Sequence, residues 1–138
     1  MSDRESEIRA AIERYAAAWL RSDVAEIVAC YHEDFTLHYN GDNALSGDHV
    51  GKPAALATLA EFSKRTRRRL VSIPAIMAGA DRGALIAREA LQDGARTVEI
   101  ERVLVYAFSD GLLSECWVHD RGQSMIDRII GQNRTASV

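Results

Sequence analysis

The sequence predicts an α+β fold in which three N-terminal helices pack on one face of a curved antiparallel sheet. Three observations support this. Apolar residues recur at helical spacing near the N-terminus, β-type residues form four successive segments in the second half, and Asp110-Gly111 is a pair typical of a two-residue hairpin turn. The helices and strands are therefore segregated along the chain. The length of 138 residues fits one domain over residues 1–138, with an ordered core of about 5–130.

Two helices are predicted at the N-terminus. The first carries one apolar stripe, made of Ile8, Ile12, Tyr15 and Trp19. Ser2 with Glu5 has the spacing of a capping box at its start, and Asp23 with Glu26 repeats that spacing at the start of a shorter second helix. The second helix would carry the apolar residues Val24, Ile27, Val28 and Tyr31.

A short strand and a third helix follow. Residues 35–39 are β-type and alternate in character, and residues 40–51 are rich in Gly, Asn, Asp and Ser, as expected of an irregular loop. Pro53 suits the first turn of a helix, because its missing N–H has no partner there in any case. This third helix is expected to end near the arginine run at 65–69.

The second half of the chain is predicted to form four strands, separated by turn-rich segments. Their ranges are Leu70–Ala78, Ala84–Leu91, Thr97–Phe108 and Leu112–His119. Pro74 cannot donate to a sheet ladder, so it indicates a bulge or an edge strand. Residues 123–130 are expected to add a final helical turn, and residues 131–138 a frayed tail.

Composition excludes several classes of protein. A hydrophobic content of 47% with 27% charged residues is typical of a globular domain and too apolar for a disordered chain. No apolar run reaches the ~18 residues of a membrane span, and the N-terminus lacks the apolar core of a signal peptide. We therefore expect a cytoplasmic protein without a membrane partner. Cys30 and Cys116 lie in different predicted elements, which favours reduced thiols.

Nucleic-acid, metal and nucleotide sites are not predicted. The net charge is −3, and the arginine run at 65–69 has no interleaved aromatic residues, which favours a solvated helix end over a nucleic-acid site. The four histidines, His32, His38, His49 and His119, lack metal-ligand spacing. No glycine-rich phosphate loop is present, so no cofactor is expected.

Two segments carry a family resemblance. Residues 37–47, Leu-His-Tyr-Asn-Gly-Asp-Asn-Ala-Leu-Ser-Gly, and residues 115–120, Glu-Cys-Trp-Val-His-Asp, resemble the loop and the last strand of SnoaL-like proteins. These belong to the nuclear-transport-factor-two-like superfamily, which includes ketosteroid isomerase and polyketide cyclases. With the element order, the likeness spans almost the whole chain. It implies a cone-shaped, largely apolar cavity between the sheet and the helices.

The resemblance and the strand pattern suggest three catalytic residues. His38 matches the family's histidine at a strand end, at the expected cavity mouth, where it would act as a base or hold a substrate oxygen; the alternative is a histidine bound by loop backbone. Gly122 stands where the family has an aspartate, so that acid is missing or displaced to Asp120. Strand alternation turns either His119 or Asp120 inward, and the alternative role of Asp120 is to cap the final helical turn.

Five further residues are candidates for substrate binding. Tyr15, Trp19 and Trp117 are aromatic residues that either line the cavity or only pack in the core. Tyr39 lines the cavity only if strand alternation turns it inward. Asn43 matches the family loop, and its alternative role is to stabilise a turn.

The strands also predict a second copy of the chain as partner. Apolar residues such as Val103, Val105 and Val118 would remain uncovered on the convex face of the sheet, so a homodimer is expected. Glu101 and Arg102 put a charge on each face of their strand. A salt bridge on an exposed or dimer-forming face is favoured over a place in the cavity wall.

The sequence leaves two functions open. The first is a cofactor-free isomerase, lyase or cyclase that acts on a small hydrophobic carbonyl compound, with His38 and Asp120 or His119 as acid and base. The second is a non-catalytic small-molecule-binding or accessory protein on the same fold, which Gly122 favours. Two titratable groups that face each other across a closed apolar cavity would favour the enzyme.

Overall fold

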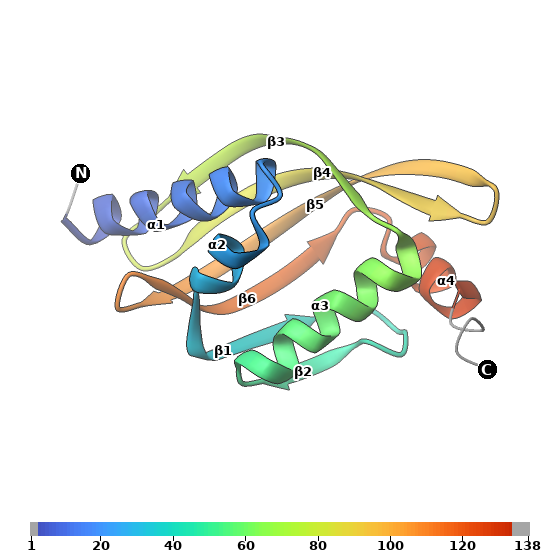
Figure 1. The fold of residues 1–138 in the computed structure, drawn as a ribbon, viewed down its shortest axis with the longest axis horizontal. Coiled ribbons are helices and arrows are strands. Elements are labelled where there is room, and N and C mark those ends of the chain that lie inside the picture. The colour runs from blue at the N-terminus through green and yellow to red at the C-terminus, as the bar shows by residue number, and fades with distance from the viewer. Residues whose placement is uncertain (1–2, 134–138) are drawn as a thin grey trace.

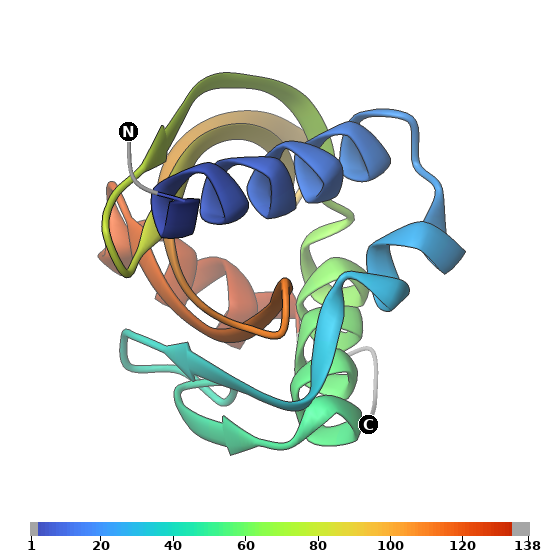
Figure 2. The same ribbon diagram turned by 90° about the vertical axis from the view of Figure 1, so that its left-hand side faces the viewer.

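A six-stranded sheet bends around three helices in the computed structural model, which describes residues 3–133 (Figures 1 and 2). The helices are α1 (Asp3–Leu20), α2 (Val24–Ala29), α3 (Lys52–Thr66) and α4 (Gln123–Asn133). The strands are β1 (Tyr31–Tyr39), β2 (Gly47–Val50), β3 (Arg69–Ala78), β4 (Gly83–Asp93), β5 (Arg96–Ser109) and β6 (Leu112–Asp120). The predicted α+β fold is confirmed.

The strand order is β2-β1-β6-β5-β4-β3. Strands β3 to β6 form the predicted antiparallel series, whereas β1 joins the sheet parallel to β6 and antiparallel to β2. Figure 2 shows the sheet as an arc, with α1 across its opening and α3 beside it. The concave face of the sheet is therefore the one that the helices cover.

The N-terminal helices follow the predicted pattern with one change. Ile8, Ile12 and Tyr15 are buried along one stripe of α1. Asp23 caps α2, since its carboxylate accepts a hydrogen bond from the Glu26 N–H at 3.1 Å. Ser2, the other predicted cap, lies outside the described residues. The prediction that Tyr31 belongs to the second helix is wrong, because β1 starts there and pairs with β6.

Three other boundaries differ from the predictions. The loop at 40–51 contains β2, which forms because it can pair with the exposed edge of β1. The predicted final turn is the 11-residue helix α4, which packs beside the C-terminal end of α3 (Figure 1). Residues 131–133 of the expected tail are helical, and residues 134–138 lie outside the described part of the chain.

Two local predictions, a hairpin turn and a bulge, are confirmed. Asp110 and Gly111 have φ angles of 56° and 75°, as a type I′ hairpin turn requires. The register of β3 against β4 shifts between Ser72 and Ala75, so Pro74 marks the bulge that its missing N–H predicts.

The core lies between the concave face of the sheet and the helices. Large side chains buried there include Phe35, Leu37, Phe62, Leu85 and Tyr106. The prediction that Val118 lies on the convex face is wrong, because it is buried on the concave one, together with Cys116. Both cysteines are buried and unpaired by any disulfide. None of the helices in residues 3–133 is long and apolar enough to cross a membrane.

Candidate functional site

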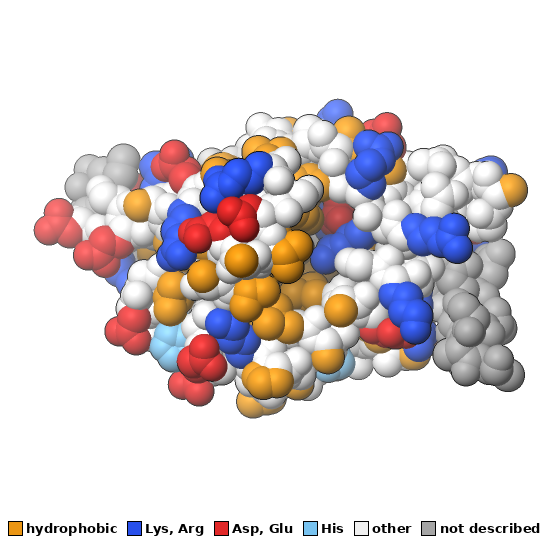
Figure 3. Space-filling model, in the orientation of Figure 1, with side chains coloured by type: hydrophobic (Ala, Val, Ile, Leu, Met, Phe, Trp, Pro, Cys, Tyr) orange, Lys and Arg blue, Asp and Glu red, His pale blue; other side chains and the backbone are white. Residues whose placement is uncertain are grey.

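Two adjoining hollows lie between the sheet and the helices. A cleft of about 840 Å³ opens between the α1–α2 corner, α3 and the start of β3, and a narrow inner cavity of about 20 Å³ lies deeper in the sheet. Residues shared by both walls are Tyr15, Trp19, Tyr31, Leu59 and Arg68. Figure 3 shows this face of the molecule, where hydrophobic side chains surround a hollow with charged groups at one end. Together the two hollows form the candidate site.

Hydroxyl and thiol groups line the inner cavity. The Tyr15 and Tyr31 hydroxyls are hydrogen-bonded at 2.8 Å, and the ring of Tyr106 contacts that of Tyr15 with 5.7 Å between centroids. Burial raises the pKa of all three tyrosines, and it raises the pKa of the nearby Cys116 thiol to about 12. These groups are therefore neutral hydrogen-bonding groups at neutral pH.

A buried ion cluster lies beside the tyrosines. Arg102 donates from Nε and Nη2 to the two Asp120 oxygens at 2.7 and 2.9 Å, and from Nη1 to Glu89 Oε2 at 3.0 Å. All three side chains are 2% exposed or less. Burial alone would lower the pKa of Arg102, but the two carboxylates raise it well above its ordinary value. The guanidinium is a permanent cation in this cluster.

Strand alternation explains how these charges reach the cavity. Glu89 lies between Ala87 and Leu91 on the buried face of β4, and Arg102 pairs in register with Asp120 across β5 and β6. The expectation that Arg102 forms a salt bridge on an exposed or dimer-forming face is therefore wrong. Glu101 does point outward, where it pairs with Arg88 at 3.5 Å.

Arg68 connects the ion cluster to the larger cleft. Its Nε donates to Ser63 Oγ at 2.8 Å, and its Nη1 lies 3.4 Å from Glu89 Oε1. The guanidinium also lies over the Phe62 and Trp19 rings, at 5.1 and 5.9 Å from their centroids. Among the residues that the structure describes, Glu89 is the one carboxylate in the cleft wall. It is thus held between two guanidinium groups at the boundary of the two hollows.

His38 lies on the other face of the sheet. Its Nδ1 is 2.7 Å from Asp48 Oδ1 and its Nε2 is 2.7 Å from Glu115 Oε2, and its ring stacks on Trp117 with 5.1 Å between centroids. Burial lowers the pKa of His38, but the hydrogen bonds to both carboxylates outweigh this effect, so its pKa is raised. Water reaches this cluster, since the Asp48 side chain is 70% exposed.

The prediction that His38 lies at the cavity mouth is therefore wrong. Leu37 and Tyr39 occupy the inner face of β1, so His38 between them must point outward. The same alternation in β6 turns Trp117 and His119 outward, and His119 is exposed beside Asn40. None of these three outward residues lines the cleft or the inner cavity.

Asp120 is turned inward, but it does not face His38. Both of its carboxylate oxygens accept hydrogen bonds from Arg102. Asp120 therefore does not have the alternative role of a cap on α4. The structure therefore does not bring together the predicted acid–base set of His38, His119 and Asp120.

Asn43 holds the loop after β1 in place. Its Nδ2 donates to Asp127 Oδ1 at 2.7 Å and its Oδ1 accepts from the Leu45 N–H at 2.8 Å. Gly41 has a φ of 106°, and a Cβ there would lie 2.3 Å from Gln123 Nε2, so the loop approaches α4 closely at this glycine. Asn43 therefore has the turn-stabilising role and lies outside the cavity walls.

The structure places Tyr15, Trp19 and Tyr39 in the walls of the candidate site. Sequence reasoning missed Glu89, and it assigned Arg68 to a solvated helix end. A signal for Glu89 exists, because a carboxylate between Ala87 and Leu91 interrupts an otherwise apolar strand face. Arg68 offers no such signal, since it lies in a run of charged residues.

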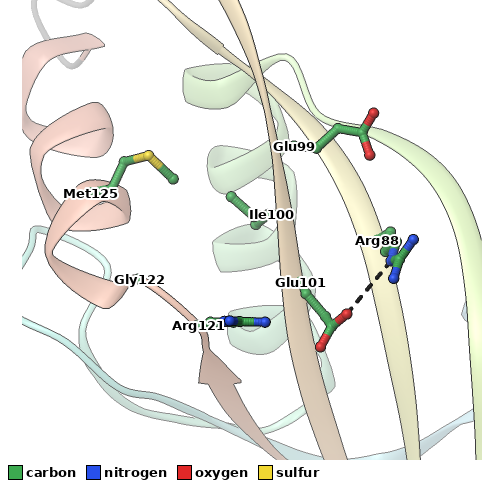
Figure 4. Close-up of a pocket in the computed structure, with 7 residues that line it drawn as sticks. All are labelled: Arg88, Glu99, Ile100, Glu101, Arg121, Gly122 and Met125. Carbon is green, nitrogen blue, oxygen red and sulfur yellow. Dashed lines mark ion pairs between the residues drawn. The ribbon is translucent and has the colours of Figure 1, made fainter.

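A separate pocket of about 360 Å³ lies where α4 begins, against the outer face of β4 and β5 (Figure 4). Arg88 and Glu101 pair on one side of it, and Met125 of α4 lies on the other.

Within residues 3–133, no group of three or more His, Cys, Asp or Glu side chains is placed to hold a metal ion.

Comparisons with solved structures show the same fold. Bal32a, from a soil-derived mobile gene cassette, has a TM-score of 0.81 and 19% identity over 92% of this chain and 98% of that chain. TerC, co-crystallised with polyporic acid, has a TM-score of 0.74 and 16% identity over 89% and 98%. An NTF2-like protein from Burkholderia xenovorans LB400 has a TM-score of 0.69 and 20% identity over 89% and 97%.

Comparisons at the level of sequence give a narrower result. No curated protein matches the chain. The family model of the SnoaL-like domain matches residues 12–116, which include the C-terminal part of α1, all of α2 and α3, and the strands that carry Glu89 and Arg102. The chain therefore belongs to the SnoaL-like domain family, with a nuclear-transport-factor-two-like fold.

Proposed function

We propose that the protein is a cofactor-free acid–base catalyst that acts on a small hydrophobic carbonyl compound bound in the cleft. The observation that carries the proposal is the place of Glu89, whose carboxylate lies between Arg68 and Arg102 where the apolar cleft meets the tyrosine-lined inner cavity. Membership of the SnoaL-like family supports an isomerase- or cyclase-type reaction in general terms.

Glu89 is the proposed general base. It would accept a proton from the carbon next to the carbonyl group. The electron pair of the broken C–H bond would form a C=C bond, and the π pair of the carbonyl group would move to its oxygen. Arg68 and the Tyr15–Tyr31 hydroxyl pair are donors that would stabilise the enolate oxygen. Return of the proton to another carbon completes an isomerisation. Attack of the enolate carbon on a second carbonyl closes a ring, and the proton held by Glu89 goes to the new alkoxide.

Arg102 and Asp120 are proposed to position the base. Arg102 fixes one oxygen of Glu89, and Asp120 holds the guanidinium by two hydrogen bonds. Such a fixed arrangement lowers the cost of reorganisation during proton transfer. Tyr39, with its hydroxyl 3.5 Å from Arg102 Nη2, completes the polar end of the cavity.

Exchange of substrate hydrogen for solvent deuterium tests this function. The protein is incubated in D₂O with 1-tetralone, 2-tetralone or a steroid enone, and NMR follows the loss of the proton next to the carbonyl. We expect exchange above background for at least one compound, and a loss of ~10²–10⁴-fold in rate for Glu89→Gln. Glu99→Gln, an exposed glutamate on the outer face of β5, is the matched control and should exchange like wild type.

A non-catalytic binding or accessory protein is the second candidate. It is favoured by the ion pairs that already engage both inner carboxylates, Glu89 and Asp120. If the ketones bind, with equal exchange rates in wild type and Glu89→Gln, binding without catalysis would replace the first proposal.

A further inference from the structure

The charges in the cleft wall do not cancel. Arg68, Arg102, Glu89 and Asp120 form a neutral group of two cations and two anions, joined by contacts of 2.7 to 3.4 Å. Arg69 also lines the cleft, and its side chain makes no hydrogen bond or ion pair within residues 3–133. The cleft therefore has an excess positive charge.

The path of the chain explains why the Arg69 side chain has no partner within residues 3–133. Arg67 ends α3 in the left-handed conformation, with a φ of 50°, and the chain then turns into β3. Arg69 is the first residue of this edge strand, and its cross-strand neighbour is Ala90, which has no polar side-chain atom. The exposed Arg67 does not line the cleft.

Arg68 adds donor capacity at the same place. Its Nε and Nη1 have partners, whereas its Nη2 has no hydrogen-bond partner in the part of the chain that the structure describes. Both arginines line the cleft, and guanidinium N–H donors without a partner in residues 3–133 suit an oxyanion, because such hydrogen bonds are charge-assisted on both sides. The rest of the wall is mainly apolar, with residues such as Leu20, Val24 and Leu56, and its serine hydroxyls, Ser22 and Ser63, carry no charge.

We propose that the ligand of the cleft is an apolar compound that carries a carboxylate or a comparable oxyanion, bound by Arg69 and Arg68. This rests on the proposed function in one respect, that the cleft is the ligand site. It narrows the substrate class from hydrophobic carbonyl compounds in general to those with an anionic group a short distance from the reacting carbon. The cleft volume of about 840 Å³ lies within the range of small-molecule sites.

A pair of fluorescent probes tests the proposal. 8-Anilinonaphthalene-1-sulfonate is an apolar anion, and N-phenyl-1-naphthylamine has the same rings without the sulfonate. Fluorescence titration should show tighter binding of the sulfonate by the wild-type protein. Arg69→Gln should weaken sulfonate binding about fivefold and leave binding of the neutral probe unchanged. The matched control, Arg67→Gln, removes a neighbouring charge outside the cleft and should change neither affinity.

Two further measurements localise the effect. Added NaCl should weaken binding of the sulfonate but not of the neutral probe, because salt screens the exposed charge. Ala60→Trp, which places a large ring in the cleft wall, should weaken binding of both probes. Circular dichroism establishes that each variant is folded before titration.

The proposal is overturned if the sulfonate binds equally to wild type and Arg69→Gln, or if it binds no tighter than the neutral probe. An unchanged affinity for the sulfonate in Ala60→Trp would also overturn it, since the anion would then bind outside the cleft. The exchange assay of Glu89→Gln uses neutral ketones and does not involve Arg69. Failure of the anion proposal and failure of the catalytic proposal are therefore separate results.

Discussion

Two clusters of ionisable groups on opposite faces of the sheet have the same plan, in which one basic side chain lies between two carboxylates. On the concave face, Arg102 lies between Glu89 and Asp120, and the hydrogen bonds span 2.7 to 3.0 Å. On the convex face the same plan is built from His38, Asp48 and Glu115, at 2.7 Å on each side. The clusters differ in burial and in the chemistry of the basic side chain.

Burial decides what each cluster contributes. The Arg102 side chain is 2% exposed, so no water can replace a lost partner, and its charge does not titrate in the physiological range. The His38 side chain is 23% exposed and the Asp48 side chain 70% exposed, so water replaces a lost partner there. The inner cluster therefore fixes the geometry of the site, whereas the outer cluster makes a smaller contribution that depends on pH.

The largest effect is expected for Arg102→Met. This substitution leaves two buried carboxylates without their shared cation, a defect that typically costs about 3–5 kcal/mol of stability. Urea denaturation at pH 7 measures the free energy of unfolding. A loss below about 1 kcal/mol would show that Arg68 or water compensates for the missing cation, and the contrast between the two faces would then disappear.

Replacement of the whole inner cluster sharpens this test. Arg102→Met combined with Glu89→Leu and Asp120→Leu removes all three buried charges, and we expect it to recover most of the stability lost by Arg102→Met alone. The same denaturation series measures both proteins. If the triple variant is no more stable than the single one, the cluster stabilises the fold itself and is not maintained for the site alone.

A smaller effect, about 1 kcal/mol, is expected for His38→Gln, and it should depend on pH. The folded-state pKa of His38 is raised above 6.5, so the contribution is fully present below that value and is lost as the pH rises through the folded-state pKa. Thermal or urea denaturation of both proteins between pH 5.5 and pH 9 should show their difference shrinking with rising pH. A constant difference would mean that His38 acts by packing on Trp117 rather than by charge.

The smallest effect is expected for Asp48→Asn, at most about 0.5 kcal/mol, because this partner of His38 is the more exposed one. Glu115→Gln is the matched comparison, since the Glu115 side chain is 39% exposed, and it should cost more. Denaturation at pH 6 ranks the two variants. An equal or reversed ranking would show that exposure does not control the strength of this cluster.

A homodimer through the convex face would change that ranking, and we propose that one forms. Val103 and Val105 are partly exposed on this face, and a second copy would cover them. Light scattering should give about twice the chain mass of 15.2 kDa, and Val105→Glu should shift the protein toward the monomer. A monomer at micromolar concentration in the wild type would contradict the proposal, and the outer cluster would remain exposed to water.

The fold could be predicted because its signals are local and repeated. The helical stripe of α1, the cap at Asp23, and the turn at Asp110 and Gly111 each specify their own segment. The 11-residue length of α4 was missed, since its stability depends on packing against α3 and on the loop that Asn43 ties to Asp127. Contacts of this kind join distant segments and leave no local pattern.

The site was harder to predict, because the alternation of residues along a strand defines two faces but does not show which of them is buried against the helices. In β1 both sets contain polar or aromatic residues, so His38 and Tyr39 were equal candidates for the cavity until the packing of the sheet was known. Glu89 and Arg102 lie on consecutive strands, 13 positions apart, and meet only through the pairing of β4 with β5. A sequence shows such a pair as two isolated polar residues on apolar strand faces.

The parallel pairing of β1 with β6 has a consequence for the order in which the protein can fold. Tyr31 pairs with Leu113 and Tyr39 with Val118, so β1, which is made early in synthesis, gains its second neighbour only when β6 has been made. Contacts between such distant segments slow folding, because a long loop must close before they form. Strands β3 to β5 can pair as successive hairpins while β1 still has an unsatisfied edge. A nascent chain that stops before Leu112 would therefore present that edge to solvent and to other chains, and we expect it to aggregate rather than to form the cleft.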